Sequence, residues 1–272
     1  MRHHRSGSIV NIGDIKVLAT TAREFVDRFD SSLSAGSAMK VAFLNANLAN
    51  IARSDSGLTK QLDDFLVLND GIGINIASLI LHRALFPENM NGTDFIPTLL
   101  TNTKHSLRIF LLGAREHTVA KAASVIASRW ARHQVVGFHQ GYFDEQECGN
   151  VAAMIADARP DLLLVALGNP KQEAWTANYV PKVCNHAFAV GALFDFMSGE
   201  IPRASHFVRS LHLEWLFRMW NEPGRLSRRY LIGVPSYLLH ILLCWLNQKK
   251  TRSSMRGTRT PSVSAERTKL RF

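Results

Sequence analysis

The chain has 272 residues, of which 46% are hydrophobic and 20% are charged, and this balance excludes an intrinsically disordered or fibrous protein. The net charge is +10, but residues 249–272 alone carry +7 of it, which excludes a nucleic-acid-binding surface spread over the whole molecule. Three cysteines without a Cys-x-x-Cys pair and eleven histidines without a His-Glu-x-x-His motif indicate neither a disulfide framework nor a metal site.

In chain order, a basic N-terminus comes first. It lacks the apolar segment of a cleavable signal peptide, which predicts a cytoplasmic protein. Continuously apolar runs then alternate with segments of helical periodicity. The runs predict strands at 41–44, 65–68, 107–112, 135–138, 162–167 and 187–190. The helical segments lie at 21–29, 74–85, 119–131, 145–158 and 172–180.

This alternation is typical of parallel sheets. For residues 1–200 we predict an α/β catalytic core, a Rossmann-like, mostly parallel sheet with helices on both faces. Thr21 and Glu24 have the spacing of a capping box at the start of the first helix.

The character of the chain changes near its C-terminus. Residues 201–248 are rich in Arg and Trp and contain no further strand pattern, so we predict a helical appendage. Its last part, 231–246, is apolar, contains Pro235 and is shorter than the roughly 20 residues that span a bilayer. We expect residues 249–272 to form a disordered basic tail. The apolar part is either an interfacial helix, with the tail drawn to an anionic membrane surface, or a terminal helix packed on the core.

The first candidate site follows the strand predicted at 65–68. Ligands of parallel sheets bind at the carboxyl ends of the strands, where Asp70 stands before Gly71 and Gly73. Asp70 is suited to act as a general base, and the glycines allow a ligand to approach the backbone. The alternative is that Asp70 caps the next helix.

A second candidate follows the strand at 41–44. The amides of Asn45 and Asn47 offer paired donors and acceptors for sugar hydroxyls or a base edge. The alternative is helix capping.

A third candidate follows the strand at 162–167. Gly168 begins a Gly-x-Pro turn into a helix whose N-terminus suits anions, with Lys171 and Gln172 beside it. Neither a Walker loop nor a Gly-x-Gly-x-x-Gly fingerprint is present. Gly113 stands in a weaker copy of the same arrangement, for which a solvated turn is the alternative.

A fourth candidate is a set of arginines, Arg218, Arg225 and Arg228. Arg225 and Arg228 share a face if helical, and guanidinium groups suit the oxygens of a diphosphate. The alternative is a solvated basic face paired with Glu214 and Glu222.

Together these motifs resemble the WecG/TagA/CpsF glycosyltransferases, also called glycosyltransferase family 26, from about residue 9 to residue 230. The resemblance rests on the following residues: Asn47, Asp70-Gly71-Ile72-Gly73, Asn91-Gly92-Thr93-Asp94, Leu167-Gly168-Asn169-Pro170-Lys171-Gln172-Glu173 with Trp175, Gly191-Ala192-Leu193-Phe194-Asp195 with Gly199, Arg203-Ala204, and Glu214-Trp215 through Arg218, Pro223, Arg225, Arg228 and Tyr230. Two positions depart from the pattern, because many members have Thr at the position of Asn45 and Arg at that of Asn89.

The resemblance implies an inverting glycosyltransferase without metal or other cofactor. It would move a sugar from a UDP-sugar to an undecaprenyl-diphosphate-linked sugar, in the synthesis of exopolysaccharide or another cell-surface polysaccharide. Asp70 would be the base, and the three arginines would hold the diphosphate. The donor and acceptor would be bound by a set of residues that the motifs carry: Asn45, Asn47, Gly71, Gly73, Asn91, Thr93, Asp94, Gly113, Gly168, Lys171, Gln172, Glu173, Asp195 and Arg203.

The resulting expectation is a peripheral enzyme on the inner face of the cell membrane, with no nucleic-acid partner and with a homo-oligomer left open. One alternative is a nucleotide-dependent oxidoreductase on a doubly wound sheet. Another is a non-enzymatic membrane or nucleic-acid-binding module that acts through the basic tail.

Overall fold

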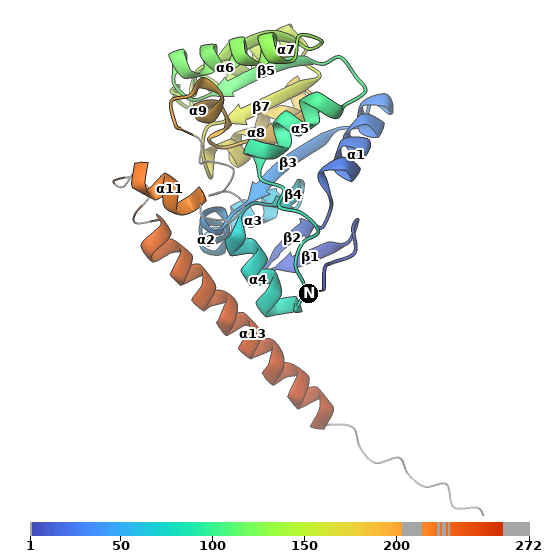
Figure 1. Cartoon of the computed structure of the whole chain (residues 1–272), viewed down its shortest axis with the longest axis vertical. Helices are drawn as coiled ribbons and strands as arrows, with labels where there is room; N and C mark the ends of the chain where they lie inside the picture. Colours follow the sequence, from blue (N-terminus) through green and yellow to red (C-terminus); the bar gives the residue numbers. More distant parts are fainter. Residues whose placement is uncertain (1, 203–213, 222–223, 225–226, 228, 258–272) are drawn as a thin grey trace, which may run out of the picture.

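A six-stranded sheet forms the centre of the molecule, and all of its neighbouring strands are parallel (Figure 1). The structure, a computed structural model, describes residues 2–202, 214–221, 224, 227 and 229–257. The strands are β3 (Met39–Leu44), β4 (Leu66–Asn69), β5 (Arg108–Gly113), β6 (Gln134–His139), β7 (Leu162–Ala166) and β8 (His186–Ala189). Their order across the sheet is β4-β3-β8-β7-β5-β6. The predicted fold class is confirmed, and each predicted strand is present with its ends shifted by no more than two residues.

Helices cover both faces of this sheet, which explains why its strands are apolar at successive positions. Val41 and Phe43 belong to the core on one face, and Ala42 and Leu44 to the core on the other. The first face is covered by α1 (Ala22–Ser34), α5 (Gly92–Asn102), α6 (Glu116–Arg129) and α9 (Leu193–Ser198). The second is covered by α2 (Ala46–Ser54), α3 (Ser56–Leu62), α4 (Ile72–His82), α7 (Cys148–Ala158) and α8 (Lys171–Val183).

The sequence predicts the start of the first helix correctly but misses several short elements. The Thr21–Glu24 capping box at the start of α1 is confirmed. Helices α2, α3, α5 and α9 were not predicted, because they are short or interrupted, as α5 is by Pro97. The hairpin of β1 (Ile9–Ile12) and β2 (Ile15–Leu18) was also missed; Gly13 in its turn has a positive φ of 61°.

The C-terminal region is helical as predicted. It contains α11 (Glu214–Asn221), a π-helical turn η1 (Arg229–Gly233) and α13 (Val234–Gly257). Pro235 is the second residue of α13, directly after η1, and a proline in the first turn is compatible with an α-helix.

Helix α13 also continues beyond residue 248, where a disordered tail was expected to start. Residues 249–256 contain no Gly or Pro and include Lys, Arg and Met, which favour helix, so the helix ends only at Gly257. Residues 258–272 lie outside the described part of the chain. In Figure 1, α13 projects well beyond the body of the molecule.

The two sides of α13 differ. On one side, Tyr237 and Ile241 are buried, at 3% and 1% exposure, in the core that includes residues of α2 and α4. This side therefore packs on the core, which was one of the two alternatives for this helix. The other side exposes leucines at positions spaced three and four residues apart: Leu239, Leu242, Leu243 and Leu246. None of the helices in the described ranges combines the length and apolar character that crossing a bilayer requires.

Candidate active site

Most of the predicted site residues gather at one edge of the sheet. Because the strands are parallel, the segments that follow β3, β4, β5, β7 and β8 all leave from their carboxyl ends. Strand β8 lies between β3 and β7, so it joins the segment with Asn45 to the segment with Gly168. The candidate site therefore has two parts, one at β3 and β4 and one at β7 and β8.

Asp70 lies at the first part, half-buried. Its peptide N–H donates to the carbonyl oxygen of Leu44 at 2.7 Å, and its Oδ2 accepts from Nδ2 of Asn45 at 3.4 Å. The N-cap of α4 is Gly71, with φ of +87°, so Asp70 stands one residue before the cap position of this helix. Its half-buried side chain lies directly after the carboxyl end of β4, beside that of β3.

Segment 88–90 braces this loop from a second direction. The peptide N–H of Gly71 donates to Oδ1 of Asn89 at 2.8 Å, and Nδ2 of Asn69 donates to the carbonyl oxygen of Glu88 at 2.9 Å. Asn89 thus supports the Asp70 loop, a role for which its place in the sequence gave no signal. The neutral side chain at this departure from the family pattern contributes to the shape of the site.

Asn45 both caps a helix and contacts Asp70 of the candidate site. Its Oδ1 accepts from the peptide N–H groups of Asn47 and Leu48 at 3.1 Å each and caps α2, while its Nδ2 contacts Asp70. Asn47 follows in the first turn of α2 and is half-buried. In the first turn of α4, Gly73 packs closely on Ala46, since a Cβ on Gly73 would lie 3.4 Å from that of Ala46.

The Asn91 motif builds the start of α5. Asn91 Oδ1 accepts from the peptide N–H of Asp94 at 2.9 Å, and its Nδ2 donates to Asp94 Oδ2 at 2.9 Å. Gly92 packs against the ring of Phe43, which a Cβ would approach to 3.1 Å. Thr93 is half-buried beside them. This motif positions a helix next to β3.

Gln172 joins the segments after β7 and β8. Its Oε1 accepts from the peptide N–H groups of Gly168 at 3.2 Å and Gly191 at 3.1 Å. Its Nε2 donates to the carbonyl oxygen of Ala189 at 3.2 Å and to Oε1 of Glu173 at 2.9 Å. The side chain was expected to bind the donor, but in this structure its four bonds are internal and it is 2% exposed.

Glu173 is fully buried, with 0% exposure. Its Oε1 also accepts from Nδ2 of Asn169 at 2.6 Å, whereas Oε2 has no hydrogen-bond partner within the described residues. Burial raises the pKa of Glu173 to about 7, against the opposing effect of the Gln172 and Asn169 hydrogen bonds. Its contacts are therefore internal, although it was expected to bind a substrate.

The remaining predicted residues differ in position. Gly113 has φ of +133° and lies so close to β7 that a Cβ would meet the carbonyl oxygen of Ala166 at 2.3 Å. Lys171 begins α8 and is exposed, and Asp195 is half-buried in the first turn of α9. Gly168, with φ of +79°, begins the turn before α8.

Only one of the four predicted arginines belongs to the part of the chain that the structure describes. Arg218 belongs to α11, and Arg203, Arg225 and Arg228 lie outside the described residues. Within the described ranges, no group of three or more His, Cys, Asp and Glu side chains is arranged to hold a metal ion.

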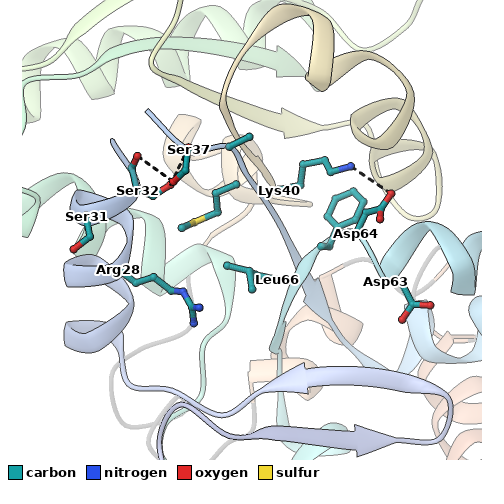
Figure 2. A pocket seen from close by; sticks show the side chains of 11 residues that line it. Arg28, Ser31, Ser32, Ser37, Lys40, Asp63, Asp64 and Leu66 are labelled. Carbon is teal, nitrogen blue, oxygen red and sulfur yellow. Dashed lines mark hydrogen bonds and ion pairs between the residues drawn. The ribbon is translucent and has the colours of Figure 1, made fainter. Parts of the chain in front are cut away.

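A cavity of about 490 Å³ lies at the opposite, amino end of β3 and β4 (Figure 2). Its charged and polar groups are largely paired with one another or with neighbours. Lys40 Nζ lies 3.8 Å from Asp64, and Asp63 binds Lys16 at 2.9 Å. Ser32 contacts Ser37 at 3.0 Å. We therefore place the candidate active site at the carboxyl edge, where Asp70 and the glycine turns lie.

Comparison with known proteins identifies the class of enzyme. A model of the family described as "Glycosyl transferase WecG/TagA/CpsF family" matches residues 10–251. A Bacillus subtilis (strain 168) protein is 34% identical over 187 residues, which cover 67% of this chain and 70% of that protein. A Bacillus spizizenii (strain ATCC 23059 / NRRL B-14472 / W23) protein is 31% identical over 180 residues, which cover 65% of this chain and 67% of that protein.

Both relatives are named N-acetylglucosaminyldiphosphoundecaprenol N-acetyl-beta-D-mannosaminyltransferase. These matches favour sugar transfer over the oxidoreductase and over a module without catalytic activity. With a family match over most of its length and an α/β core of the expected kind, the chain belongs to the WecG/TagA/CpsF family and is a glycosyltransferase.

Proposed function

We propose that the chain transfers a sugar from a UDP-sugar to a sugar carried on undecaprenyl diphosphate, with inversion at the anomeric carbon and without a metal ion. The polymer served would be an exopolysaccharide or another cell-surface polysaccharide. The observation that carries the proposal is the Asp70 carboxylate, which is held at the carboxyl ends of β3 and β4 in a chain of this family. The names of the two relatives supply the acceptor class.

In the proposed step Asp70 removes the proton from the acceptor hydroxyl as that oxygen attacks the anomeric carbon of the donor. The bond between this carbon and the phosphate oxygen breaks, and its electron pair leaves with UDP. A single displacement of this kind inverts the configuration at the carbon. Asn45, at 3.4 Å from the carboxylate, helps to keep it facing the acceptor.

The departing UDP needs stabilisation of its negative charge. Lys171 is exposed at the start of α8, and the free peptide N–H groups of a helix N-terminus attract phosphate oxygens. We assign this end of the site to the donor. Arg218, Arg225 and Arg228 would bind the diphosphate of the lipid acceptor.

The experiment is transfer by the full chain from each member of a panel of UDP-sugars to a synthetic N-acetylglucosaminyl-diphosphate lipid. Products are identified by mass, in buffer with EDTA and in buffer with Mg²⁺. A disaccharide-diphosphate lipid formed equally in both buffers supports the proposal. Absence of any product across the panel contradicts it, and dependence on Mg²⁺ contradicts the metal-independent step.

We also infer that the exposed leucine side of α13 rests on the inner membrane surface. Leu239, Leu242, Leu243 and Leu246 form an exposed apolar strip, and Lys249 and Lys250 follow three and four residues after Leu246 in the same helix. Apolar area combined with basic residues favours an anionic bilayer surface.

Flotation with liposomes tests this inference. Serine at all four leucine positions should abolish binding to vesicles with anionic lipid, while transfer to a water-soluble acceptor analogue is kept. The matched control is serine at Phe138 and Met154, which are exposed to 40% and 46% elsewhere on the surface. Equal losses in both variants would contradict a specific role for α13.

A further inference from the structure

Two amide side chains converge on one buried carboxyl oxygen behind the donor end of the site. Oε1 of Glu173 accepts from Asn169 Nδ2 at 2.6 Å and from Gln172 Nε2 at 2.9 Å. Since no part of Glu173 is exposed, its side chain is not accessible to a substrate. We propose that Glu173 is a positioning residue that fixes the orientation of both amides, and that Asn169 presents its carbonyl oxygen to the sugar nucleotide. This inference rests on the proposed function.

Gln172 shows why the orientation of an amide matters here. A terminal amide can rotate by half a turn, and its surroundings decide which end is NH₂ and which is oxygen. Glu173 Oε1 and the carbonyl oxygen of Ala189 both accept, so they hold the NH₂ group. The oxygen then faces the peptide N–H groups of Gly168 and Gly191. A reversed amide would place oxygen against acceptors and NH₂ against donors.

Asn169 is oriented by the same carboxyl oxygen. With its NH₂ group bound to Glu173, its Oδ1 is left with no hydrogen bond to any described residue. The side chain is half-buried and follows Gly168 directly, in the turn that connects β7 to α8. A carbonyl oxygen at this place accepts hydrogen bonds from a sugar hydroxyl or from a base N–H group. Asn169 was not among the binding residues predicted from the sequence.

The protonation state of Glu173 does not limit this role. Burial places its pKa near neutrality, at about 7, and the groups that oppose the shift are hydrogen-bond donors, not charged side chains. Oε1 can accept in the neutral form, with the proton on Oε2, as well as in the ionised form. Glutamine at this position, which also has a carbonyl oxygen, should therefore perform the same task.

Steady-state kinetics of the full chain separate positioning from a general loss of structure. We expect Glu173→Leu to raise the KM for the UDP-sugar about tenfold, which corresponds to the loss of one well-placed hydrogen bond, with the KM for the lipid acceptor within about twofold of wild type. Asn169→Ala should have the same selective effect. Glu173→Gln should restore the donor KM to within about threefold of wild type. Asn178→Ala, on an exposed position of α8, is the matched control for the asparagine change and should alter neither KM.

The double variant Asn169→Ala/Glu173→Leu gives the sharpest comparison. If Glu173 acts through Asn169, the two effects should not multiply, because residues in one network are not additive. Multiplied effects, equal changes in both KM values, or no rescue by glutamine would each overturn the proposal.

Amide hydrogen exchange provides a readout that does not need turnover. Gly168 and Gly191 should lose protection in Glu173→Leu and keep it in Glu173→Gln, and unchanged protection in both variants would also overturn the proposal. If the wild-type chain transfers sugar and Glu173→Leu does so with an unchanged donor KM, the positioning role alone fails. If wild type forms no product with any donor, the proposed function fails, and the exchange data alone decide whether Glu173 orders the two glycine turns.

Discussion

The two parts of the carboxyl edge are built differently. At β3 and β4, Asp70 and Asn45 are half-buried and joined by a long contact of 3.4 Å. At β7 and β8, Gln172 and Glu173 are almost fully buried, and the Gln172 amide makes four hydrogen bonds. A group that exchanges a proton with a substrate must be reachable, whereas a group that holds two turns together is most effective when water is excluded. We therefore assign reaction to the first part and framework to the second.

The largest expected effect tests the reactive part. Asp70→Asn keeps the size of the side chain but removes the proposed base, so kcat should fall by about 10²- to 10⁴-fold. The melting temperature should remain close to that of wild type, because the carboxyl group is only half-buried. Asp63→Asn, at the opposite edge of the sheet, is the control and should keep full activity. Near-normal turnover by Asp70→Asn would remove the base from this residue.

The framework part should respond in the opposite way. Gln172→Leu leaves the N–H groups of Gly168 and Gly191 without their acceptor, and we expect a loss of about 3–4 kcal/mol in the free energy of unfolding. Urea denaturation measures it, with Gln146→Leu on an exposed position as control. A loss of unfolding free energy no larger than that of Gln146→Leu would show that the Gln172 amide does not stabilise the two glycine turns.

The strands and the position of the candidate site could be predicted from the sequence. The strands are predictable because each is apolar on both faces, and parallel strands bring Asp70, Asn45 and Gly168 to one edge without further information. The pattern of strands therefore indicates the edge of the sheet at which the candidate site lies.

The environment of each side chain could not be read in the same way. Glu173 and Lys171 stand two residues apart in one motif, yet the first is 0% exposed and the second is on the surface. A glutamate in a polar turn is ordinarily exposed, so nothing local indicates its burial. The contact of Asn89 with Gly71 and that of Gln172 with Gly191 depend on how separate loops meet, which no spacing rule specifies.

A third prediction uses the pH dependence of stability to examine the framework. In the folded chain the pKa of Glu173 is raised from 4.5 to about 7, so folding favours its neutral form. This contribution is fully present below about pH 4.5 and is lost as pH rises through about 7. Relative to Glu173→Gln, wild type should lose about 3 kcal/mol of unfolding free energy over this interval. Urea denaturation of both proteins at pH 4.5, 6 and 8 measures the difference. Parallel pH profiles would show that Glu173 is not the buried titrating group.

The smallest expected effect concerns Asn45, which has both a structural contact and a contact with the proposed base. Asn45 caps α2 through its oxygen and contacts Asp70 through its NH₂ group. Asn45→Ala should lose both, with about 1 kcal/mol of stability and a few-fold decrease in kcat. Asn45→Ser keeps a capping oxygen but has no group to reach Asp70, so it should recover the stability and not the rate. Thermal denaturation and kcat, measured on the same preparations, separate the two quantities. If serine restores both the stability and kcat, the 3.4 Å contact between Asn45 and Asp70 has no part in catalysis. Asn45 would then be a structural residue, like Gln172 and Glu173 at the other part of the edge.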